Sequence, residues 1–92
     1  MARGDDPQPA LGAAIRELRT KRDTTQEDLA HDAGITVGTL SLIERGRSNP
    51  AWGTVKRIAQ ALDMTMGDLA QRADHNEADL AASALTRRGL NT

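Results

Sequence analysis

The chain has 92 residues, which is enough for one small domain and leaves little room for an enclosed active site. It contains no cysteine, so disulfides and cysteine-based metal sites are excluded. The formal net charge is −1, so attraction to an acidic partner must come from local placement of charge. Trp52 is the single aromatic residue, and a core of Leu, Ile, Val, Met and Ala suits helix packing.

The first nine residues predict a flexible arm, because they contain glycine, proline and aspartate without periodicity. They lack the apolar stretch of a signal peptide, and no segment approaches membrane-spanning length. The expected location is therefore the cytoplasm, with no membrane partner. A first helix is predicted over about 10–22, where Leu11, Ala14, Ile15 and Leu18 recur at helical spacing.

Two short helices joined by a tight turn come next. Thr25 is a candidate N-cap in the capping-box pattern Thr-Gln-Glu-Asp, and Gly34 stands where the helix would end in the left-handed conformation. Thr36 is the next candidate cap, and the helix that it begins is expected to stop at Gly46. This pattern predicts a helix-turn-helix at about 26–45.

Two further helices complete the predicted domain. Pro50 pre-sets the backbone for a fourth helix that ends near Asp63. A second capping box begins at Thr65 and opens a short fifth helix that ends at about Arg72. The fold class is therefore all-α.

The predicted domain organisation has three parts. The flexible arm covers 1–9, and a compact five-helix domain covers 10–72. Residues 73–92 form a C-terminal tail, for which two outcomes stay open. The tail either remains unfolded or forms an additional weak helix capped by Asn76.

The third predicted helix is the element that indicates function. Leu40 and Ile43 are its natural core residues on a helical wheel. The opposite side has small residues near its start and a cation at its end. Its members are Val37, Gly38, Ser41, Leu42 and Arg45. A helix with small protruding residues can enter a DNA major groove about 12 Å wide.

The run from Leu11 to Leu69 resembles the lambda-repressor and Cro type of helix-turn-helix proteins, often called the XRE family. The resemblance covers about two thirds of the chain and rests on linked segments in family order: Ile15–Arg19, Thr25–Ala30, Gly34, Leu40–Arg47, Asn49–Pro50 and Ile58–Leu62. It implies that the second helix crosses the DNA backbone and that the third reads the major groove.

The resemblance also implies roles for individual residues. Gln26 matches a family glutamine that hydrogen-bonds phosphate and neighbouring side chains at a helix N-terminus. Arg19 and Glu44 match a salt bridge that fixes the third helix against the first. The implied DNA-binding set is Thr25, Gln26, Thr36, Val37, Gly38, Thr39, Ser41, Leu42, Arg45, Arg47 and Asn49.

The base-reading positions depart from the family pattern. Many members carry Gln, Arg, Ser or Asn there, whereas this chain has valine, glycine and leucine. Such residues cannot make the bidentate hydrogen bonds that distinguish guanine or adenine, but they can contact thymine methyl groups. We therefore expect T-rich contacted positions, shape readout, or both. Two alternatives stay open: Val37 packs partly against the second helix, and Leu42 is an ordinary exposed leucine.

Other side chains indicate less. Trp52 is expected to be partly buried, as a core residue, a phosphate contact or a dimer contact. Arg3 on the arm is a candidate for a minor groove. His31 and His75 are far apart and lack companions at ligand spacing, so no metal site is expected. The sequence has no catalytic set, so we expect no enzyme activity and no cofactor.

We interpret the chain as a sequence-specific double-stranded DNA-binding transcription regulator, a repressor that binds its operator as a homodimer and is nucleoid-associated when bound. Two alternatives stay open. A protein-interaction module that retains the fold would explain the near-zero charge and the apolar face, although Gln26, Arg45 and Arg47 oppose it. An antitoxin would bind both DNA and a toxin, and a neighbouring toxin gene would support it.

Overall fold

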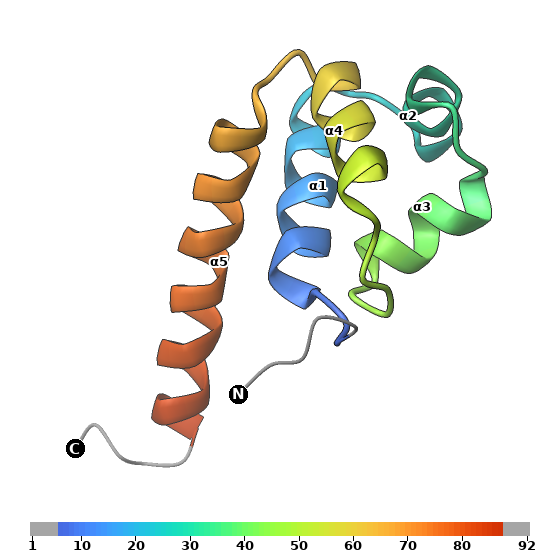
Figure 1. The fold of residues 1–92 in the computed structure, drawn as a ribbon. Helices are drawn as coiled ribbons and strands as arrows, with labels where there is room; N and C mark the ends of the chain where they lie inside the picture. The colour runs from blue at the N-terminus through green and yellow to red at the C-terminus, as the bar shows by residue number, and fades with distance from the viewer. Residues whose placement is uncertain (1–5, 88–92) are drawn as a thin grey trace.

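The structure is a computed structural model that describes residues 6–87, within which every regular element is a helix (Figure 1). The helices are α1 (Pro9–Lys21), α2 (Gln26–Ala33), α3 (Val37–Glu44), α4 (Trp52–Ala61) and α5 (Met66–Arg87). The predicted all-α, five-helix fold is confirmed. Arg3 lies outside the described residues. Within the described part, no helix is both long and apolar enough to cross a membrane.

The helix ends follow from local sequence. The Thr25 hydroxyl accepts a hydrogen bond from the Asp28 N–H at 3.0 Å, and the Thr36 hydroxyl accepts one from the Thr39 N–H at 3.0 Å. These side-chain oxygens satisfy backbone donors that the first turn of a helix leaves unpaired. Gly34 ends α2 with a φ of 70°, a conformation that glycine adopts without steric penalty. The turn between α2 and α3 is therefore short and fixed.

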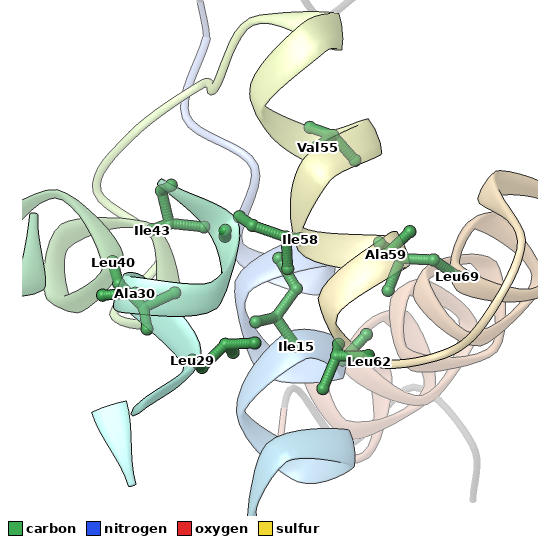
Figure 2. Close-up of a cluster of buried hydrophobic side chains, with 12 residues drawn as sticks. Ile15, Leu29, Ala30, Leu40, Ile43, Val55, Ile58, Ala59, Leu62 and Leu69 are labelled. Carbon is green, nitrogen blue, oxygen red and sulfur yellow. The ribbon is translucent and has the colours of Figure 1, made fainter. Parts of the chain in front are cut away.

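The core lies where α1 and α4 meet the other three helices (Figure 2). Its largest fully buried side chains are aliphatic: Ile15, Leu29, Leu40, Ile43, Ile58 and Leu69. Each helix contributes at least one of them, so burial of apolar surface couples all five elements. In Figure 1, α1 lies between α5 on one side and the α2–α3 pair on the other.

Two glycines let α1 and the end of α3 approach closely. A Cβ atom on Gly12 would lie 2.0 Å from the backbone oxygen of Ile43. A Cβ atom on Gly46, whose φ is 72°, would lie 2.8 Å from the Cα atom of Pro9. Both distances are shorter than any van der Waals contact allows, so neither position has room for a side chain. The backbone of α1 therefore sets where α3 ends.

The fifth helix is longer than predicted. We expected it to end at about Arg72, but α5 continues without a break to Arg87 and has 22 residues. Asn76 lies inside this helix, so the prediction that it caps a separate helix is wrong. No proline or glycine interrupts residues 68–87, and an ion pair between Arg72 and Glu17 joins α5 to α1. The helix therefore continues because its sequence contains no helix breaker after Arg72, and it packs along α1.

Candidate nucleic-acid interface

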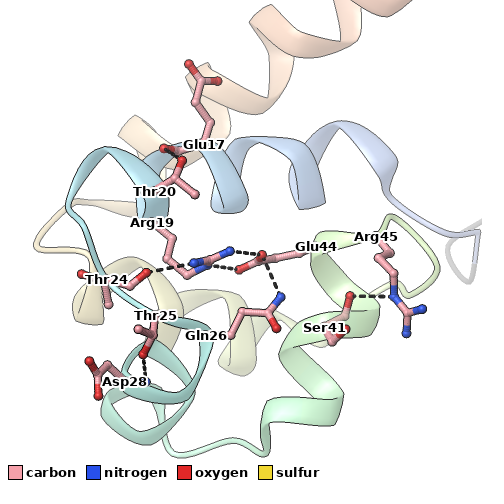
Figure 3. Close-up of polar contacts among 10 residues, drawn as sticks. All are labelled: Glu17, Arg19, Thr20, Thr24, Thr25, Gln26, Asp28, Ser41, Glu44 and Arg45. Carbon is pink, nitrogen blue, oxygen red and sulfur yellow. Dashed lines mark hydrogen bonds and ion pairs between the residues drawn. The ribbon is translucent and has the colours of Figure 1, made fainter.

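A bidentate ion pair joins α1 to α3. The Nε of Arg19 lies 2.8 Å from Oε2 of Glu44, and its Nη2 lies 3.0 Å from Oε1 (Figure 3). The third guanidinium nitrogen, Nη1, donates to the carbonyl of Thr24 at 2.9 Å. Only 2% of the Glu44 side chain and 13% of the Arg19 side chain are exposed. The hydrogen bond to Glu44 raises the pKa of Arg19 and so favours the charged guanidinium.

The carboxylate of Glu44 also holds α2. The amide Nε2 of Gln26, the first residue of α2, donates to Oε1 of Glu44 at 3.1 Å (Figure 3). One buried carboxylate therefore contacts side chains from both α1 and α2 while it sits near the end of α3. Charge-assisted hydrogen bonds of this kind are about twice as strong as neutral ones. They fix the angle between the two helices of the helix-turn-helix.

The predicted faces of α3 agree with the structure. Leu40 and Ile43 are buried, whereas Val37 and Leu42 expose 41% and 45% of their surface. Ser41 is half-buried between them. Large apolar side chains are usually buried. The exposed Val37 and Leu42 on one short helix therefore form a surface suited to apolar contact.

Part of the predicted site gathers around one hollow. Gln26, Ser41 and Arg45 line a depression of about 270 Å³ between the first three helices. The Nε of Arg45 donates weakly to the Ser41 carbonyl at 3.4 Å. Arg16, on α1, lines the same depression and is exposed. Sequence reasoning missed Arg16, because its position depends on how α1 crosses α2 and α3. Its spacing of one helical turn from Arg19 was the available signal.

The loop after α3 separates the other predicted residues. Arg47 is exposed, and its N–H donates to the Leu42 carbonyl at 3.0 Å, which holds the loop against the helix. Asn49 instead lines a groove of about 290 Å³ between the starts of α1 and α4 and the α5 surface. The structure therefore does not bring Asn49 to the hollow of Arg45.

Trp52 is not partly buried, as we expected, but 73% exposed. It is the first residue of α4, and the buried stripe of that helix begins only at Val55. The indole therefore precedes the part of α4 that the other helices cover. It borders the same groove as Asn49, where Met66 and Leu69 supply apolar surface.

Two further features of a binding site are absent from the described part of the chain. In it, no three His, Cys, Asp or Glu side chains gather closely enough to hold a metal ion. Within the same residues, no buried side-chain nitrogen or oxygen lacks a hydrogen-bond partner. The buried polar side chains of this part are therefore paired within the fold.

A family model described as helix-turn-helix matches residues 15–73. The chain is 42% identical over 55 residues to the HTH-type transcriptional regulator DdrOP3 of Deinococcus deserti, which covers 60% of this chain and 43% of that protein. It is 31% identical over 66 residues to the cryptic phage CTXphi transcriptional repressor RstR of Vibrio cholerae, over 72% and 60% of the two chains. The chain spans half or less of the length of the first curated relatives that it matches.

A solved structure extends the similarity to most of the molecule. The clp gene regulator ClgR of Corynebacterium glutamicum is 31% identical and superposes with a TM-score of 0.86, over 90% of this chain and 88% of that one. The superposition and the family match together cover both helices of the motif and the helices that hold them. The chain therefore belongs to the helix-turn-helix family of the XRE type.

Proposed function

We propose that the chain binds double-stranded DNA through α2 and α3 and regulates transcription, as a repressor at an operator. The observation that carries this proposal is the combination of a rigidly held α3 with an exposed outer face. Glu44 ties the helix to α1 and α2, while Val37 and Leu42 remain available. The names of the relatives, regulators and a repressor, support the same role. Such a protein works on the chromosome in the cytoplasm, without catalysis or a cofactor.

In the proposed complex, α3 enters the major groove and α2 lies across the backbone. The N-terminus of α2 would offer backbone N–H groups to a phosphate, and the Gln26 amide, which donates one hydrogen to Glu44, would offer its second. Arg16 and Arg45, which border the depression beside Gln26, add positive charge to the same place. Phosphate contacts fix register, whereas base contacts carry sequence information. We therefore assign positioning to these residues, with Thr25 beside them.

The base-reading role falls to the exposed face of α3. This face consists of Val37, Gly38, Ser41 and Leu42, and its small members Gly38 and Ser41 would let the backbone approach the base edges. Thr36 and Thr39 lie at the start of this face. Arg47 and Asn49 follow in the loop, which would run beside the next phosphates of the backbone.

We further propose that the chain acts as a homodimer. A two-fold operator requires two third helices about 34 Å apart, which is one turn of DNA. Trp52 is largely exposed and borders an apolar groove that includes Leu11 and Met66. Exposed tryptophan beside apolar surface is typical of interfaces. Analytical ultracentrifugation of the protein and of Trp52→Ala tests this, and we expect a smaller dimer fraction for the variant. Equal dimer fractions would show that Trp52 is not part of the interface.

The first experiment is selection of random duplex DNA by the purified protein, followed by titration at several salt concentrations. We expect a palindromic site whose affinity falls with salt, because phosphate binding releases counterions. Arg45→Ala should weaken binding uniformly and lower the salt slope by about one. Arg57→Ala, which removes an exposed charge from α4, is the matched control. Weak binding without sequence preference would contradict the proposal and favour a protein-binding role for α3.

A further inference from the structure

The outer face of α3 offers methyl groups where a base reader usually offers amides. Val37 and Leu42 are its two large side chains, and both expose more than two fifths of their surface. Gly38 lies between them and leaves open space, since a Cβ atom there would meet only the Thr36 hydroxyl at 3.9 Å. The face is therefore a shallow apolar surface with a gap at its centre.

The hydroxyl at the start of the helix is already engaged. The Thr36 Oγ1 accepts from the Thr39 N–H at 3.0 Å and donates to the Thr39 hydroxyl at 2.9 Å. Thr36 is exposed, and its hydroxyl serves the helix cap. The hydroxyl of Thr36 is therefore already used within the helix.

Two of the polar groups nearby are committed to the scaffold, whereas Arg45, at the end of the face, stays exposed. The Arg19 guanidinium binds Glu44 and the Thr24 carbonyl, and the Gln26 amide also donates to Glu44. Between residues 36 and 42, the sequence holds no Arg, Lys, Asn, Gln, Asp or Glu. No side chain of that segment can therefore make the bidentate hydrogen bonds that identify guanine or adenine.

The major groove contains one kind of apolar group, the C5-methyl of thymine. A 5-methylcytosine carries a methyl group at the same ring position. A hydrogen-bonding reader separates the two bases by O4 and N4, but an apolar surface responds to the methyl that they share. We propose that α3 recognises pyrimidine C5-methyl groups. Cytosine at a contacted thymine position should therefore bind weakly, and its methylation at C5 should restore binding. This inference rests on the proposed function.

The expected effect is modest for each group. Burial of one methyl contributes about 0.8 kcal/mol, which corresponds to about a fourfold change in affinity. Contacts at symmetric positions of two half-sites multiply, so two methyl groups correspond to about 15-fold. Changes of this size are readily measured by fluorescence anisotropy.

The test uses the full chain and the operator obtained by selection. Each thymine is replaced by deoxyuridine, which lacks only the methyl group. We expect about fourfold weaker binding at one or more central positions of each half-site and no change in the flanks. At those positions, a C·G pair should bind weakly, and 5-methylcytosine·G should bind about fourfold better than C·G.

Variants assign the contacts to α3. Val37→Ala and Leu42→Ala keep good helix formers on exposed positions, so both should fold. Each should abolish the thymine-to-uracil difference at its own position, whereas Gln60→Ala, on the exposed side of α4, should preserve every difference. If an operator is obtained and deoxyuridine or methylation changes nothing, the inference is wrong and the proposed function stands. If no operator is obtained, the proposed function itself fails.

Discussion

Replacement of Gly38 should stabilise the fold and weaken DNA binding at the same time. Gly38 is the second residue of α3, and its Cβ position is open apart from the Thr36 hydroxyl at 3.9 Å. Its φ is not in the left-handed region, so alanine fits the backbone. Glycine in a helix costs about 0.5–1 kcal/mol relative to alanine. Gly38→Ala should therefore raise the free energy of unfolding by about 0.5 kcal/mol, at the lower end because the site is in the first turn.

The same methyl group should obstruct the complex. It would stand between Val37 and Leu42, where we place the closest approach of α3 to the bases. Overpacking of a close interface costs about 1–3 kcal/mol, so operator affinity should fall about tenfold. Stability is followed by thermal unfolding, where about 0.5 kcal/mol raises Tm by a few degrees. Affinity is followed by anisotropy.

A matched control separates the two effects. Gly67 is the second residue of α5, and its Cβ position meets the Thr65 hydroxyl at an ordinary 3.6 Å. Gly67→Ala should stabilise by a similar amount and leave DNA binding unchanged. If Gly38→Ala binds the operator as tightly as the unmodified protein, the face of α3 does not approach the bases, and the reasoning is refuted.

Four other changes test the scaffold and the proposed phosphate contact. Gly12→Ala should destabilise by about 3 kcal/mol in urea unfolding, because its Cβ atom would overlap the backbone of α3. Arg19→Met should cost about 3 kcal/mol by leaving the Glu44 carboxylate buried without its partner, and Glu44→Gln in the same chain should recover part of that loss. The pKa of Glu17 is lowered, chiefly by the hydrogen bond from Arg72 on α5. The Glu17 carboxylate therefore stabilises the fold above its ordinary pKa of 4.5, and this stabilisation is lost as the pH falls through the lower pKa of the folded state. The stability difference between the protein and Glu17→Gln should accordingly shrink on acidification, and a constant difference would exclude this role. Arg16→Ala should reduce the salt slope of operator binding by about one without changing the selected sequence.

Local signals in the sequence predicted the motif well. Thr25, Thr36 and Gly34 act on backbone groups within four residues of themselves, so their roles are visible in the chain alone. The burial of Leu40 and Ile43 followed from helical spacing. The expected partnership of Arg19 with Glu44 depended on the family resemblance, since 25 residues separate the two in the chain.

The missed features depend on contacts between distant segments. The C-terminal half of α5 has an alanine-rich pattern too weak to predict a helix, and its first half is tied to α1 through Arg72. Trp52 lies at the edge of the apolar stripe of α4, and only the position of its neighbours decides whether it is covered. The placement of Arg16 beside Arg45 likewise depends on how α1 crosses α3. Such features require tertiary geometry.

The role of α3 as the reader of sequence is tested most directly by repeating the DNA selection with Leu42→Gln beside the unmodified protein. Glutamine can bind adenine N6 and N7 in a bidentate manner, which leucine cannot. We predict that the two selected sites differ at one symmetric position in each half-site, where the variant prefers adenine. Identical selected sites, with equal affinities, would show that this face does not read DNA.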